Sequence, residues 1–148
     1  MRVRILVLLP LVALACAGLP RPIEDPEVKV TGVAVSHVSL AGAEGVFDFQ
    51  VVNPNGISIP LSAVEWEFAV GGTRAMRGSM ELAAKIPARG VAPVRAAIKL
   101  GMREAADVAA QVASGVRGYS LRGKLYFTTP LGRLGVGFRH LGELASPI

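Results

Sequence analysis

Polar and apolar residues alternate along several short stretches of this chain, and such alternation is typical of β-strands with one buried face. Residues 64–70 (VEWEFAV) give the clearest case, because their apolar residues share one face and their two glutamates share the other. Similar alternation, or a run of β-branched residues, recurs at residues 28–35, 46–52, 76–82, 94–100, 119–127 and 134–138. The pattern therefore predicts about seven short strands.

One stretch departs from this alternation. Residues 102–114 (MREAADVAAQVAS) are rich in alanine and other helix formers, and Gly101 and Gly115 flank them. They predict a helix that packs one apolar face on a sheet edge. The residues of that face, at helical spacing, are Met102, Ala105, Ala106, Ala109 and Val112.

Short alternating strands with frequent turn signals are typical of a β-sandwich. We therefore expect an all-β fold, an immunoglobulin- or fibronectin-III-like β-sandwich of about seven strands with one helix at about residues 102–114. The chain has a single cysteine, which excludes an antibody-type domain, because that domain joins its sheets through a cysteine pair. A hydrophobic content of 51% excludes the intrinsically disordered class.

The N-terminus has the pattern of a secretory signal peptide. Arg2 and Arg4 precede an apolar run at residues 5–15 (ILVLLPLVALA) that ends in small residues. This run is shorter than the roughly 20 residues that a membrane-spanning helix needs. We expect residues 1–15 to be removed on export, which lowers the formal charge of +5 by two.

Cys16 directly follows that run, in a stretch that resembles the lipobox of bacterial lipoproteins. Ala15 is the small residue that the cleavage site needs, although Ala13 stands where the lipobox usually has leucine. The resemblance implies lipidation of Cys16 and a membrane anchor. Since Ala17 follows instead of aspartate, it also implies the periplasmic side of the outer membrane. The alternative is an ordinary signal peptide whose removal leaves a free thiol.

Three further segments follow the signal peptide. Residues 16–27 contain the lipidated cysteine and a tether with three prolines, residues 28–141 contain the folded domain, and residues 142–148 form a C-terminal tail. We expect the proline-rich tether to be extended and to hold the domain away from the bilayer.

Asn53-Pro54-Asn55 marks the end of the second strand. Pro54 holds Asn53 in an extended conformation and has no N–H for a sheet ladder. Asn55 and Gly56 tolerate positive φ, and asparagine side chains bond to backbone groups that a turn leaves unpaired. These residues predict a structural turn, with contact to a client or ligand as the alternative.

The order of these features resembles the WHy domain of group 2 late-embryogenesis-abundant proteins, named for water stress and hypersensitive response. The resemblance covers roughly residues 28–140. Its motif residues are Asn53, Pro54, Asn55 and Pro60, followed by Gly71-Gly72, Gly78 and the loop Ile86-Pro87-Ala88-Arg89-Gly90. It implies a folded β-sandwich with one helix and protection against desiccation or other stress. It implies no catalytic residues and no cofactor.

A search for catalytic chemistry agrees with that implication. His37 and His140 have no carboxylate or cysteine at ligand spacing, so we interpret them as surface or edge residues. Glu65 and Glu67 share a strand face and are expected to be solvated or paired with basic residues on a neighbouring strand. The sequence therefore predicts neither an enzyme nor a metal site.

Four basic residues are expected on the outer face of the last two strands: Arg122, Lys124, Arg133 and Arg139. Clustered cations attract anionic lipid headgroups. They also keep a domain soluble and protect an exposed sheet edge from pairing. Nucleic acid is excluded as a partner, because aromatic residues are not interleaved with these charges as base stacking requires.

Three functions therefore remain open. The first is a stress-protective lipoprotein that binds client proteins or a membrane surface weakly. The second is a lipid-handling protein, because the flexible or small residues Met76, Gly78 and Met80 leave room for a cavity in the core. The third is a passive structural protein of the cell envelope.

Overall fold

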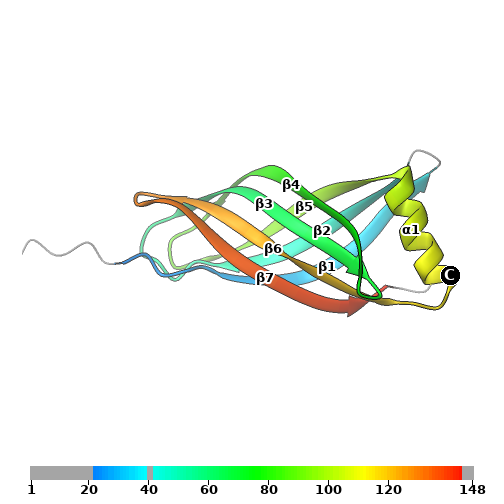
Figure 1. Cartoon of the computed structure of the whole chain (residues 1–148). Coiled ribbons are helices and arrows are strands. Elements are labelled where there is room, and N and C mark those ends of the chain that lie inside the picture. The colour runs from blue at the N-terminus through cyan, green and yellow to red at the C-terminus, as the bar shows by residue number, and fades with distance from the viewer. Residues whose placement is uncertain (1–21, 40–41, 145–148) are drawn as a thin grey trace, which may run out of the picture.

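Seven strands and one helix make up the part of the chain that this computed structural model describes, residues 22–39 and 42–144 (Figure 1). Their bounds are β1 (Glu27–Ser39), β2 (Gly42–Val52), β3 (Ile59–Val70), β4 (Thr73–Ile86), β5 (Val91–Gly101), α1 (Met102–Ala113), β6 (Gly118–Thr129) and β7 (Gly132–Glu143). The predicted signal peptide and Cys16 lie outside the described residues. No helix in the described ranges has the length and apolarity to cross a membrane.

The strands form two antiparallel sheets that pack against each other. One sheet has the order β1-β2-β5 and the other the order β4-β3-β6-β7. The predicted all-β sandwich with one helix is confirmed. Its fourth strand pairs with the third, whereas in antibody constant domains the fourth strand lies beside the fifth.

The core lies between the two sheets and contains the apolar face of each alternating strand. Phe47 of β2 contacts Trp66 of β3 edge to face, with ring centroids 5.4 Å apart. Phe49 of β2 contacts Phe138 of β7 in the same way at 4.9 Å. Edge-to-face pairs stabilise a protein by about 0.5–1.5 kcal/mol beyond the contribution of their buried area. These two aromatic pairs therefore stabilise the packing of one sheet on the other.

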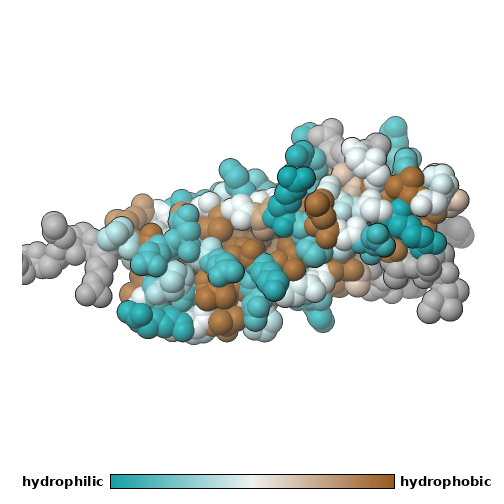
Figure 2. All heavy atoms as spheres, turned by 90° about the horizontal axis from the view of Figure 1, so that it is seen from below, coloured by the Kyte–Doolittle hydropathy of each residue, from teal (hydrophilic) through white to brown (hydrophobic). Residues whose placement is uncertain are grey.

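The sheets are not closed at their edges. β1 and β7 lie side by side along one edge of the sandwich. Figure 2 views the molecule from this side, and apolar side chains show there between polar ones. The partly buried apolar residues of these two strands are Val28, Val33, Leu134 and Val136.

Helix α1 lies across one end of the sandwich, between β5 and β6 (Figure 1). Ala105 and Val108 pack on the core, whereas Met102 is 64% exposed and Ala106 and Ala109 are exposed. The predicted packing face was therefore wrong for three of its residues. The observed face contains branched Val108, which buries more apolar area than an alanine does.

Candidate functional site

A row of four residues crosses the middle of the four-stranded sheet. Trp66 of β3 lies opposite Gly78 of β4 on one side and Gly123 of β6 on the other. Gly123 in turn lies opposite Phe138 of β7. Residues directly opposite each other on neighbouring strands share a face. The row therefore alternates between a large aromatic residue and a glycine.

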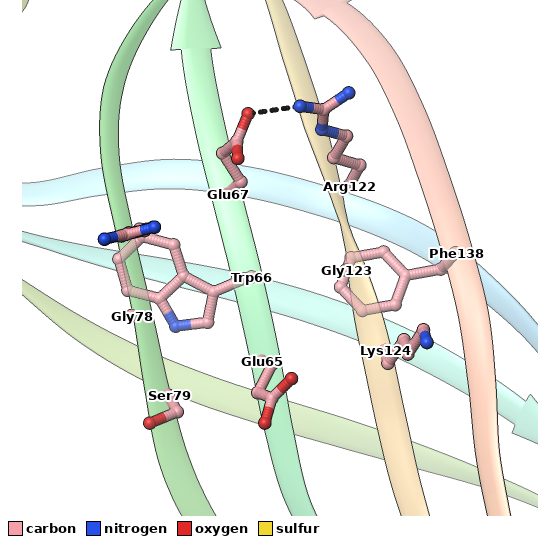
Figure 3. A pocket seen from close by; sticks show the side chains of 10 residues that line it. Glu65, Trp66, Glu67, Gly78, Ser79, Arg122, Gly123, Lys124 and Phe138 are labelled. Carbon is pink, nitrogen blue, oxygen red and sulfur yellow. Dashed lines mark hydrogen bonds and ion pairs between the residues drawn. The ribbon is translucent and has the colours of Figure 1, made fainter.

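The two glycines leave space for the two aromatic rings. A Cβ atom on Gly78 would lie 2.6 Å from the Trp66 indole. On Gly123 it would collide with the Glu65 carbonyl oxygen and lie 2.8 Å from the Phe138 ring. Figure 3 shows the indole over Gly78 and the phenyl ring over Gly123. The rings thus lie flat against the sheet.

The rings of this row lie on the inner face, where Trp66 contacts Phe47 and Phe138 contacts Phe49. The opposite, outer side of the row is the floor of an open depression of about 680 Å³ on the four-stranded sheet. Charged and polar side chains from β3, β4 and β6 surround it (Figure 3). They are Glu65, Glu67, Arg77, Ser79, Arg122 and Lys124. We refer to this region as the charged depression.

One ion pair crosses the charged depression from β3 to β6. The Arg122 guanidinium donates to the Glu67 carboxylate at 2.6 Å (Figure 3). Arg122 also lies opposite Arg139 of β7 in the strand register. Like charges in that position repel, and Glu67 offsets the repulsion from the other side.

A second connection runs from β7 through β6 to β3. The Arg133 guanidinium lies 3.8 Å from the centroid of the Tyr126 ring, and the Tyr126 hydroxyl donates to the Glu65 carboxylate at 2.7 Å. That hydrogen bond, with a smaller contribution from desolvation, raises the pKa of Tyr126 above its usual value. Gly135 lies under the ring, since a Cβ atom there would be 3.1 Å from it.

The structure places the four predicted basic residues on one outer face but divides them by their partners. Arg122 is paired with Glu67, and Arg133 stacks on Tyr126. The side chains of Lys124 and Arg139 have no hydrogen bond or ion pair within the described ranges. Arg77 on β4 is likewise unpaired within those ranges and lines the charged depression. Arg77 is not one of the four basic residues predicted from the sequence, because it lies on β4 and not on the last two strands.

The predicted turn at Asn53 is held by its side chain. Asn53 is buried, and its side-chain amide donates to the carbonyl oxygens of Ile57 at 2.8 Å and Pro87 at 2.9 Å. A longer bond of 3.4 Å reaches the Ile86 carbonyl, and the Asn53 side-chain oxygen accepts from the Asn55 N–H. This residue therefore joins the β2–β3 loop to the β4–β5 turn.

Asn55 extends these bonds to the N-terminal segment. Its side-chain amide donates to the Glu24 carbonyl and its side-chain oxygen accepts from the Glu24 N–H, both at 2.8 Å. Positive φ occurs at Arg89, whereas Asn55 and Gly56 do not adopt it. The predicted structural turn is present, and side-chain hydrogen bonds of Asn53 hold it without positive φ at residues 55 and 56. These contacts join residues 22–26, 53–58 and 87–90 at one end of the sandwich, and residues 130–131 of the β6–β7 turn lie at the same end (Figure 1). We refer to these four segments as the loop end.

The two motif prolines lie at positions where the structure requires no backbone N–H for strand pairing. Pro54 is exposed between β2 and β3. Pro60 is the second residue of β3, and the pairing of β3 with β6 begins only at Leu61. Pro60 therefore needs no donor toward β6.

A second and narrower opening, of about 290 Å³, lies between β4 and β5 near the start of α1. Its apolar lining includes Trp66, Met76, Met80, Ile98 and Leu100. Charged Lys99 and Glu104 also line this opening. It gives access to the space between the two sheets.

The described residues contain no group of three or more histidine, cysteine or acidic residues that could hold a metal ion. His140 is half-buried, with its ring centroid 5.9 Å from that of Tyr119. The side chain of His37 lies outside the described part.

Comparison with known proteins gives a family for this chain. Residues 48–142 match the late embryogenesis abundant protein family. No curated protein matches the chain in sequence.

Solved structures share the fold. The solution structure of AT1g01470 from Arabidopsis thaliana has a TM-score of 0.72 and 22% identity, over 86% of this chain and 85% of that protein. A crystal structure of a protein from Archaeoglobus fulgidus has a TM-score of 0.62 and 12% identity, over 86% and 99%. A solution structure titled as a putative late embryogenesis abundant (LEA) protein, At2g46140.1, has a TM-score of 0.53 and 20% identity, over 83% and 72%. The family match covers more than half of the chain, and the chain therefore belongs to the late embryogenesis abundant protein family.

Proposed function

We propose that this protein is a non-catalytic, water-stress-protective protein that binds other proteins weakly through the charged depression. Family membership supports the link to water stress. The observation that carries the proposal is the set of unpaired cations, Lys124, Arg139 and Arg77, beside the Glu67–Arg122 pair. This surface carries both positive and negative side chains, which suit binding to the charged groups of other proteins.

Such a surface is suited to weak and general binding. An exposed ion pair stabilises by about 0–1 kcal/mol, and salt screens it. Several such contacts hold a partially unfolded client briefly and keep it apart from others. They do not select one partner by shape.

The test is rescue of a dried enzyme. Lactate dehydrogenase is dried and rehydrated with this protein, with an equal mass of serum albumin, or alone. We expect this protein to preserve more enzyme activity and to reduce light scattering more than albumin does. Rescue equal to that of albumin would contradict the proposal.

We further propose that Cys16 is lipidated and anchors the chain in the cell envelope, on the periplasmic side of the outer membrane. The lipobox-like stretch before Cys16 supports this. Stable anchoring takes more than one acyl chain, which a lipoprotein cysteine supplies. A Cys16→Ser variant should lose the lipid mass and leave the membrane fraction. Retention of the variant in that fraction would refute the anchor.

The opening between β4 and β5 favours a second candidate function, the handling of a lipid. Its lining contains Met76 and Met80, which adapt to irregular apolar ligands, and Glu104 and Lys99 are available for a polar headgroup. Native mass spectrometry of the chain tests this candidate. Reproducible adducts of lipid mass, beyond the lipid on Cys16, would favour it over the surface-binding function. A chain without adducts would refute it.

A further inference from the structure

The loop end presents an apolar surface built from three separate connections. Leu131 of the β6–β7 turn is 76% exposed, and Ile57 of the β2–β3 loop is 45% exposed. Val91, which follows the β4–β5 turn, is 51% exposed. Each connection also contains an exposed proline. These prolines are Pro54, Pro87 and Pro130.

Proline is well suited to a surface that moves from water into a lipid interface. It is apolar and has no N–H to desolvate, so its transfer into lipid leaves no backbone donor unpaired. The described connections at the opposite end, residues 71–72 and the segment from Gly101 to Gly118, contain no proline. The loop end therefore differs in composition from the helix end.

The backbone of the loop end is also paired within the protein. The Arg89 N–H donates to the Asn55 carbonyl, and the Asn53 N–H donates to the Gly90 carbonyl, both at 2.9 Å. In the β6–β7 turn, the Leu131 N–H donates to the Thr129 hydroxyl oxygen at 3.2 Å. With the carbonyls bound by the Asn53 side chain, many polar backbone groups of these loops need no water. A segment that enters lipid requires this pairing.

The chain that leads to Cys16 leaves the domain at this end. Two hydrogen bonds between Glu24 and Asn55 fix the segment beside the β2–β3 loop. The six peptide links from Cys16 to Pro22 span at most about 20 Å when extended, and a 12-residue strand is about 40 Å long. A lipid on Cys16 would hold the loop end near the bilayer and leave the helix end far from it.

We propose that the loop end enters the interface of the phospholipid bilayer to which the chain is anchored, with Leu131, Ile57 and the three turn prolines among the headgroups. This inference depends on the proposed lipid anchor and is independent of the protective activity. Glu24, Asp25 and Arg89 of the loop end are exposed, so this end has charges of both signs. The contact is therefore apolar and does not require anionic lipid. In this orientation the strands stand roughly perpendicular to the bilayer, and the charged depression on the four-stranded sheet faces sideways, away from the lipid.

The test uses the full lipidated chain in phosphatidylcholine vesicles whose acyl chains carry bromine, a short-range quencher of tryptophan fluorescence. Leu131→Trp places a tryptophan at the loop end. Met102→Trp is the matched control, because Met102 is 64% exposed at the helix end. Trp66 is common to both variants, and the parent chain gives its contribution.

We expect roughly threefold more quenching at position 131 than at position 102, since interfacial groups sit about 5–10 Å into the bilayer. Adding Ile57→Asp to the Leu131→Trp variant should reduce the quenching at position 131. Equal quenching at the two positions, or none at position 131, would overturn the inference. Flotation of the vesicles separates the causes. A chain that does not float refutes the anchor and the contact together, and a chain that floats without quenching refutes the contact alone.

Discussion

The two faces of the four-stranded sheet use the same strands but are stabilised by different forces. The inner face alternates glycine with aromatic rings, and a Cβ atom on Gly78 or Gly123 would lie within 3 Å of its neighbours. The outer face carries the charged depression, where Arg122 of the Glu67–Arg122 pair is 66% exposed. Shape determines the inner face, whereas weak and screened charges occupy the outer one.

This difference separates stability from binding. A methyl group added at Gly78 or Gly123 on the inner face would collide with neighbouring atoms that have little room to move. A change of charge on the outer face leaves the fold intact and alters what the surface attracts. The fold therefore tolerates variation of its outer face, and function can be tested there without unfolding the domain.

The largest effect is expected for Gly123→Ala. The new methyl group would meet the Glu65 backbone and the Phe138 ring, and the backbone cannot move without disturbing two strand pairings. We expect a loss of about 3 kcal/mol in the free energy of unfolding, measured by urea denaturation with circular dichroism. Gly118→Ala is the control, because nothing lies within 4 Å of its Cβ position. A similar loss in both variants would contradict the packing argument.

Gly78→Ala should have an intermediate effect. Here the new methyl group meets only the Trp66 indole, a side chain on the neighbouring strand. Displacement of the ring should reduce stability by about 1–2 kcal/mol and change the fluorescence of Trp66, the single tryptophan. An unchanged emission spectrum would show that the indole does not lie over Gly78.

The outer face should respond much less. A double-mutant cycle of Glu67→Ala and Arg122→Ala should give a coupling energy of about 0.2–1 kcal/mol, because the pair is exposed. Raising the salt concentration should lower this value. A coupling as large as the effect of Gly123→Ala would remove the distinction between the two faces.

The smallest effect concerns Tyr126. Its hydrogen bond to Glu65 raises its pKa, so the stabilisation is present below the unfolded pKa of about 10 and is lost as the pH rises through the folded pKa. We expect Glu65→Gln to lower the pKa of Tyr126 in an ultraviolet titration of tyrosinate. Tyr126→Phe isolates the signal of Tyr119, whose pKa burial also raises. An unchanged curve for Glu65→Gln would show that the Glu65 carboxylate does not act on the Tyr126 hydroxyl in solution.

Alternation along the chain was sufficient to predict which residues of β3 are buried. It predicted Val64, Trp66 and Phe68 on the inner face, and all three are buried there. It could not predict that Trp66 faces Gly78 and Gly123, because cross-strand register depends on two chain segments at once. The shape of the charged depression follows from that register.

The same limit applies to the loop end and the helix. The Asn53 side chain was expected to bond to the backbone, but its partners Ile86 and Pro87 are 33 and 34 residues away. The face of α1 depends on how the chain leaves β5 at Gly101, which periodicity alone does not describe. The partners of Arg122 and Arg133 are also on other strands.

The most direct test of the proposed function compares charge reversal on the two sheets. One variant carries Lys124→Glu and Arg77→Glu, two exposed residues that line the charged depression on the four-stranded sheet. The other carries Lys29→Glu and Lys99→Glu on exposed positions of the three-stranded sheet, with the same change in net charge. Each is added to lactate dehydrogenase before drying. The first variant should lose most of its protection while the second keeps it, and equal protection by both would contradict a role for the charged depression.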